Sequence, residues 1–122
     1  MSNTMELLLK CNFADLPVGT FKLKRLSKEV GEDVLFSLTA LRYDRVQEIR
    51  DGNSTDIDIH ILLAGVTEPN LKSSELMAHY GAATPVDMIK KMLLPGEIED
   101  LSRQIEKLSG YRSVTIEQIK KK

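Results

Sequence analysis

The feature that most constrains this chain is an amphipathic segment near its C-terminal end, residues 93–111. A Pro95-Gly96 break precedes it, and Gly110 can adopt the left-handed conformation that ends a helix. Its large apolar residues recur at steps of three and four, so a helix gathers them on one face. They are Ile98, Leu101, Ile105 and Leu108. This stripe predicts a helix that packs in a core or docks on a partner, because the segment offers no residues suited to metal binding or nucleophilic attack.

Length and composition bound the class of protein. With 122 residues, 42% of them hydrophobic and 29% charged, the chain is expected to form one soluble domain. A formal net charge of −1 argues against a nucleic-acid partner, and no apolar run approaches the roughly 18–20 residues of a membrane span. The first residues carry an acid where a signal peptide is basic, and the single cysteine suits a reducing compartment. We therefore expect a cytoplasmic protein with no nucleic-acid and no membrane partner.

Two segments in the first third of the chain have strand character. Residues 20–26 alternate apolar and basic side chains, as half-buried strands do, and residues 34–41 form a second, more apolar strand. The polar link between them, residues 27–33, contains a glycine, so we interpret the pair as an antiparallel hairpin. The basic residues of this region then serve to protect a strand edge rather than to bind a partner. They are Lys22, Lys24, Arg25 and Lys28.

Helical spacing and stop signals dominate the rest of the sequence. They predict helices over residues 4–10, 43–52, 56–65, 73–80, 84–93 and 97–109. Residues 56–61 alternate like a strand, but Asp56 can cap a helix and Gly65 can end one, so we favour a helix there. Thr84-Pro85 is a strong helix start, since it combines a capping hydroxyl with proline at the first helical position.

These elements predict an α+β fold, in which a small antiparallel β-hairpin packs against several short α-helices and the C-terminal half is helical. Residues 1–110 are expected to form a single domain. Residues 111–122 are expected to form a C-terminal arm that is flexible.

The residue types that hold metals or act as nucleophiles are scattered. His60 and His79 are far apart in the sequence, and Cys11 stands alone, so no metal-ligand spacing is present. Cys11 has no neighbouring histidine, and we expect it to be a small buried thiol.

The carboxylate pairs also have an ordinary interpretation. Asp56/Asp58 and Glu99/Asp100 are typical of surface charges and helix starts, whereas acid–base catalysis needs one group in a distinct environment. The glycines lie apart from one another and form no phosphate-binding motif. We therefore expect no enzymatic activity, no metal and no cofactor.

Apolar side chains near the C-terminal end are the candidates for binding another protein. Methionines 77, 88 and 92 could line an adaptable surface, although core packing is the commoner role for each. The helical stripe could likewise lie in the core or against a partner helix. The predicted partner-binding residues are Ile98, Leu101, Ile105, Leu108, Tyr111, Ile116 and Ile119.

Three segments resemble one known family. Residues 94–98 through 109–111, residues 64–71 (Ala-Gly-Val-Thr-Glu-Pro-Asn-Leu) and residues 36–44 occur in the order and spacing of the XkdN-like tail assembly chaperones of contractile-tailed phages and PBSX-type prophages. The resemblance covers roughly residues 13–122. It implies a non-enzymatic protein that binds and shields the tape measure protein during tail assembly, with the tail tube protein as a second candidate partner. It also implies absence from the finished virion.

Two further hypotheses and two alternatives accompany this resemblance. Such chaperones often occur with a longer frameshifted product, and the lysines at residues 120–122 are compatible with a slippery codon run. The apolar stripe would also permit self-association. The first alternative is a general interaction or regulatory module that uses the same stripe for another phage or host protein, and the second is an enzyme, which the motif survey disfavours.

Overall fold

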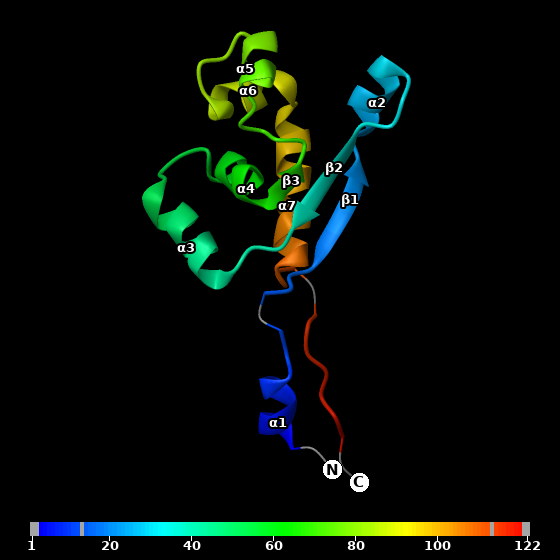
Figure 1. Ribbon diagram of the computed structural model, residues 1–122, viewed down its shortest axis with the longest axis vertical. Helices are drawn as coiled ribbons and strands as arrows, with labels where there is room; N and C mark the ends of the chain where they lie inside the picture. Colours follow the sequence, from blue (N-terminus) through cyan, green and yellow to red (C-terminus); the bar gives the residue numbers. More distant parts are fainter. Residues whose placement is uncertain (1–2, 13, 113, 121–122) are drawn as a thin grey trace.

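The computed structural model describes residues 3–12, 14–112 and 114–120. Figure 1 shows short helices arranged around one long helix and a small sheet. The strands are β1 (Val18–Lys22), β2 (Leu35–Thr39) and β3 (Val66–Glu68). The helices are α1 (Thr4–Leu9), α2 (Lys24–Val30), α3 (Tyr43–Gly52), α4 (Ile57–Gly65), α5 (Ser74–His79), α6 (Pro85–Met92) and α7 (Pro95–Leu108).

The described strands form one antiparallel sheet in the order β1-β2-β3. The predicted hairpin is therefore present, with Phe21 opposite Phe36 and Gly19 opposite Leu38. These residues share one face of the sheet, and on it Phe36 and Leu38 are buried. The third strand was not predicted from the sequence, because three residues give too short a pattern to recognise.

The core lies between this inner face of the sheet and helices α4, α6 and α7. Its fully buried side chains come from segments far apart in the sequence, and they include Phe36, Leu38, Leu62, Met88, Ile89 and Ile105. The Thr84 hydroxyl accepts a hydrogen bond from the amide of Asp87 and caps α6, as predicted. The prediction of an α+β fold with a helical C-terminal half is confirmed.

The segment after β1 differs from the prediction of a strand reaching residue 26. The amide of Leu23 still donates to the carbonyl of Val34 on the neighbouring strand segment, and the chain then leaves the sheet and forms α2, which ends at Gly31 with a left-handed φ of 76°. The buried Ser27 hydroxyl accepts a hydrogen bond from the amide of Val34 and ties this helix to the next strand. The edge-protection hypothesis was therefore wrong for three of its four basic residues, because Lys24, Arg25 and Lys28 lie on α2.

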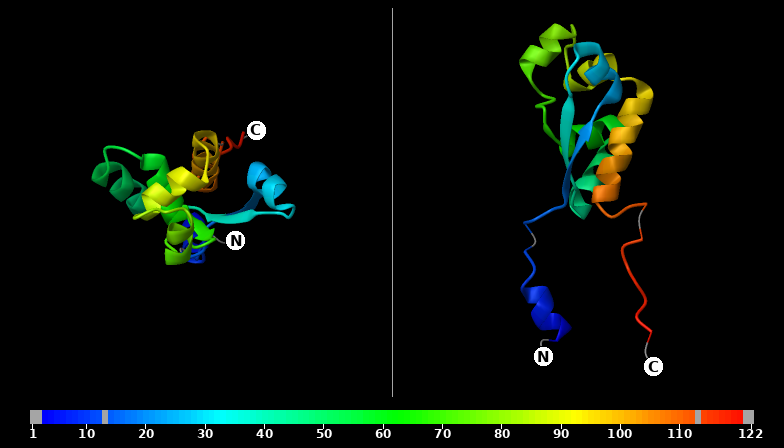
Figure 2. Two further views of the ribbon diagram at one scale, coloured as in Figure 1. Left: turned by 90° about the horizontal axis from the view of Figure 1, so that it is seen from above. Right: turned by 90° about the vertical axis from the view of Figure 1, so that its right-hand side faces the viewer.

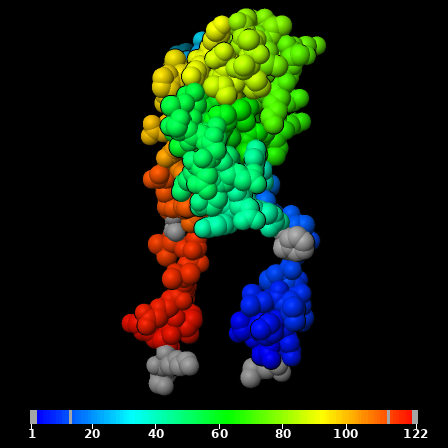
Figure 3. All heavy atoms as spheres, turned by 90° about the vertical axis from the view of Figure 1, so that its left-hand side faces the viewer, coloured from blue at the N-terminus to red at the C-terminus, as the bar shows by residue number. Residues whose placement is uncertain are grey.

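Two terminal segments leave the body at the same end. Helix α1 and the extended residues 114–120 both project away from the sheet and α7 in Figures 1 and 2. Figure 3 shows them as two separate projections below the packed body. No residue of α1 is buried, and the side chain of Asn3 caps the helix by accepting from the amide of Glu6. Among the described residues, no helix is long and apolar enough to cross a membrane.

Candidate partner-binding surfaces

The predicted stripe on α7 contributes mainly to the core. Ile105 is fully buried and Leu101 is buried, while Ile98 and Leu108 are half-buried at the two ends of the stripe. A Cβ atom added at Gly65 would lie 2.7 Å from Cδ1 of Ile105, so α4 and α7 approach closely because Gly65 has no side chain. In this conformation Ile105 is closed to a partner, whereas the buried Leu101 borders a groove, and partner binding by the residues of the stripe stays a prediction.

The remaining predicted residues lie at and beyond the end of α7. The Tyr111 ring is half-buried, and the Arg50 guanidinium lies 5.5 Å from its centroid. Ile116 and Ile119 are 85% and 74% exposed, and neighbouring Val114 is 92% exposed. This apolar segment has no cover from the described residues of its own chain, which makes it the most accessible part of the predicted set.

The root of this arm is fixed by charge. Glu106 is mostly buried, and its carboxylate pairs with Arg103 at 2.9 Å, with Arg112 at 3.2 Å and with Arg50 at 3.7 Å. Because three cations from α3, α7 and the arm meet one carboxylate, the first residues after α7 are held against the body. The exposed apolar side chains of the arm begin at Val114.

Helix α1 is a second exposed apolar surface. Met5, Leu7, Leu8 and Leu9 are each at least half exposed. The sequence predicted this helix and its apolar side. It also predicted that so short a terminal helix would depend for its stability on docking against another surface. The expectation that Cys11 is buried was wrong: Cys11 is exposed just after α1, and its thiol donates to the carbonyl of Leu7.

A groove of about 850 Å³ separates α7 from β1 and α2. The half-buried Phe21 and the buried Leu23 and Leu101 are the apolar part of its lining, and charged residues make up most of the remainder. Among these, Lys107 and Arg112 lie at the α7 end from which the arm leaves.

An ion pair joins α2 to α7 across this groove. Arg25 donates to both carboxylate oxygens of Glu97, at 2.9 and 3.1 Å, and to the carbonyl of Met92. The hydrogen bond that Arg25 donates to Glu97 raises the pKa of Arg25. Burial alone would raise the pKa of Glu97, but hydrogen bonds from Arg25 and from the amide of Leu94 outweigh it and lower that pKa. The pair therefore stays charged and fixes α2 against the start of α7.

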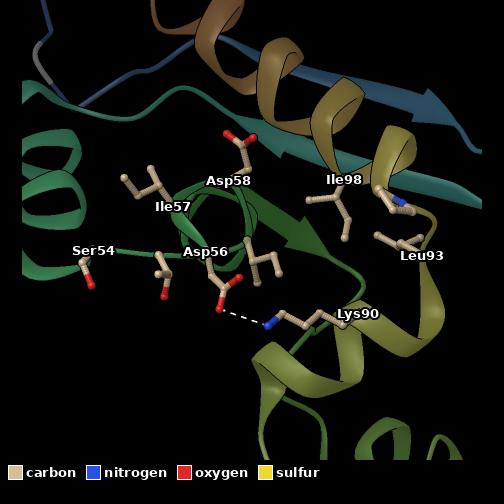
Figure 4. Close-up of a pocket in the computed structure, with 10 residues that line it drawn as sticks. Ser54, Asp56, Ile57, Asp58, Lys90, Leu93 and Ile98 are labelled. Atoms are coloured by element: carbon tan, nitrogen blue, oxygen red, sulfur yellow. Dashed lines mark ion pairs between the residues drawn. The ribbon is translucent and has the colours of Figure 1, made fainter.

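A second cleft, of about 530 Å³, lies where α4 begins beside the α6–α7 corner (Figure 4). Asp56 has a left-handed φ of 57° and pairs with Lys90 at 3.1 Å, so its carboxylate does not cap α4. Asp58 accepts from Ser102 and Arg103. Both acids are thus engaged in structural pairs. Within residues 3–12, 14–112 and 114–120, no three His, Cys, Asp or Glu side chains are grouped so as to hold a metal ion.

The comparison with known families identifies the chain. A family model for phage XkdN-like tail assembly chaperone proteins matches residues 20–121. The chain belongs to this family. The match begins inside β1 and includes the arm, whereas α1 lies before it.

The fold has a counterpart among solved structures. The crystal structure of the protein yqbn superposes with a TM-score of 0.62 at 23% sequence identity, over 80% of this chain and 89% of that one. This similarity shows that the two chains share a fold. No curated protein matches the chain.

Membership of the tail assembly chaperones changes how the surfaces are interpreted. A chaperone acts by covering other proteins, so exposed apolar segments matter more here than the ion-paired clefts. Such a family implies interaction with tail proteins. The arm and α1 are the two described segments that offer uncovered apolar side chains in series.

Proposed function

We propose that this chain is a non-enzymatic chaperone that binds the tape measure protein during tail assembly and shields its apolar segments. It would act in the cytoplasm of the bacterial host and be absent from the finished virion. The observation that carries the proposal is the uncovered apolar arm, which lies within the region that the tail assembly chaperone family matches.

The two projections suit a client that is long, helical and apolar. The exposed side chains of α1 and of residues 114–120 leave the same end of the body, so both can contact one client segment (Figure 3). Tyr111, Ile116 and Ile119 supply the arm side of this contact. Ile105 would reach a client only if α7 separated from the body, since it is fully buried.

The mechanism requires binding that can be reversed. Each projection offers only a few apolar side chains, so one copy should bind weakly, while many copies on one client bind strongly together. Tube subunits that polymerise around the tape measure protein would then displace the copies one by one. The tail tube protein is accordingly the second partner we propose.

Co-expression with tagged tape measure fragments tests the proposal. The full chain should be captured, and the double variant Ile116→Asp with Ile119→Asp should lose at least about tenfold in capture, since roughly 1.4 kcal/mol corresponds to a factor of ten. The matched control is Thr115→Asp with Gln118→Asp, which adds the same charge to exposed polar positions of the same arm. Equal capture of the two variants, or no capture of the parent chain, would contradict the proposal.

A further inference from the structure

The first strand has a free edge. β1 pairs only with β2 among the described residues, so it is one of the two edge strands of the sheet. Val18 is 72% exposed, Thr20 is exposed, and the one charged residue of the strand, Lys22, is already paired with Asp33 at 3.1 Å. Unpaired edges of this kind are ready to accept another strand.

A cavity continues the inner face of the sheet beyond this edge. The groove beside α7 contains Phe21, Leu23 and Leu101 among its lining residues. A fourth strand added to β1 would lie over this groove and turn alternate side chains into it. The sheet and the groove together therefore define a site for an extended segment with apolar residues on one face.

The C-terminal arm has that pattern. Residues 114–120 are extended and read Val-Thr-Ile-Glu-Gln-Ile-Lys, which is rich in the β-branched residues that favour strands. Val114 and Ile116 would fall on one face of such a strand, and Thr115, Glu117 and Ile119 on the other.

One antiparallel register matches every exposed apolar residue of the arm to an apolar residue of the edge. With Ile116 opposite Phe21, Val114 falls opposite Leu23, and Ile119 falls opposite the exposed Val18. The first two pairs face the groove, and the third lies on the outer face. A parallel strand cannot form these three pairs together, because Ile119 would then lie three residues beyond the position opposite Ile116 rather than three before it.

We propose that the arm of one copy adds to β1 of a second copy in this antiparallel register. The arm cannot do so on its own body. A Cβ atom added at Gly19 would lie 3.8 Å from the side chain of Leu108, so α7 ends beside the start of β1. An arm that folded back from the end of α7 would therefore run in the same direction as β1 and could pair with it only in parallel. Glu106 also holds Arg112, which leaves about 7 Å of chain before Val114, too short to reach the far end of β1.

Self-association of this kind covers the arm in the absence of a client. If each copy both gives and accepts an arm, the contact closes as a symmetric dimer. The inference does not depend on which tail protein is the client, and its test contains no tail protein.

Disulfide trapping between two differently labelled chains tests the register. One chain carries Cys11→Ser and Thr20→Cys, and the other carries Cys11→Ser and Glu117→Cys, which the register places opposite each other. Opposed Cβ atoms in a sheet are about 4.5–5.5 Å apart, close to disulfide range. The matched control replaces Glu117→Cys with Gln118→Cys, one residue along and on the other face. The first pair should form the mixed disulfide at least tenfold faster than the control pair.

Sedimentation of the unmodified chain supplies the second measurement. The parent chain should associate as its concentration rises, Ile116→Asp should remain monomeric, and Thr115→Asp should associate like the parent. The proposal is overturned by a parent chain that stays monomeric or by equal trapping rates for the two cysteine pairs. It is also overturned by a single chain with Cys11→Ser, Thr20→Cys and Glu117→Cys that closes its disulfide within one molecule at high dilution.

Discussion

The close approach of α4 and α7 at Gly65 leads to a quantitative prediction. Three side-chain atoms of Ile105 would lie 2.7, 2.8 and 3.0 Å from a Cβ at this position. Ile105 is fully buried, and its β-branched side chain has little rotamer freedom in a helix, so it cannot move aside without disturbing the core. Gly65→Ala should therefore destabilise the protein through overpacking.

The expected magnitude follows from core substitutions in general. An extra methyl group in a packed core costs about 1–3 kcal/mol of unfolding free energy. Removing the Ile105 side chain as Ile105→Ala costs about 2–5 kcal/mol, because a cavity remains. In the double variant the new methyl group occupies part of that cavity, so its stability should be close to that of Ile105→Ala alone. The coupling between the two sites should therefore be about 1–3 kcal/mol.

Urea unfolding followed by circular dichroism measures these four stabilities. Gly96→Ala is the matched control, because Gly96 lies in the first turn of α7, has no left-handed φ, and would place its Cβ in open space. It should be neutral or stabilise the protein by up to about 1 kcal/mol. Additive losses in the Gly65/Ile105 cycle, within about 0.5 kcal/mol, would refute the reasoning, and so would a Gly65→Ala variant as stable as the parent.

Three further predictions concern caps, burial and charge. Thr84→Ala should lower the unfolding free energy by about 1 kcal/mol in urea titrations, whereas Asn3→Ala should leave it unchanged, because α1 has no buried residue. Leu101→Ala should cost about 2–5 kcal/mol in the same assay, and Ile119→Ala should cost almost nothing, since only Leu101 is in the core. The pKa of Glu97 is lowered in the folded state, so its contribution is present above its unfolded value of 4.5 and is lost as the pH falls through the folded value. Glu97→Gln should therefore flatten the fall in stability below about pH 5, and an unchanged slope would contradict the role of the ion pair.

Local signals were sufficient for most helices. The Thr84-Pro85 start specified α6 because the cap and the fixed φ of proline act within one turn. For residues 56–65 the competing strand pattern was resolved correctly in favour of a helix. A helix needs partners only along its own backbone, so the sequence around it carries most of the information.

The segment after β1 shows where local reading failed. Residues 20–26 alternate as a strand would, but the period-two pattern ends where Gly31 and the Ser27–Val34 hydrogen bond favour a helix. The helical spacing of Leu23, Leu26, Ser27 and Val30 was the available signal. Short elements give too few repeats for either period to dominate, so contacts with other segments decide.

The candidate surfaces divide in the same way. By itself the sequence determined that α7 has one apolar face and that residues 111–122 follow the glycine that ends this helix. Both can be read from the order of the residues along the chain. Only the tertiary structure decided that Ile105 packs against Gly65 of α4, that Leu101 is buried, and that the arm and α1 stand uncovered. It also decided that β1 presents an open edge beside a groove. Exposure depends on what distant parts of the chain place against a side chain, and no local pattern contains that information.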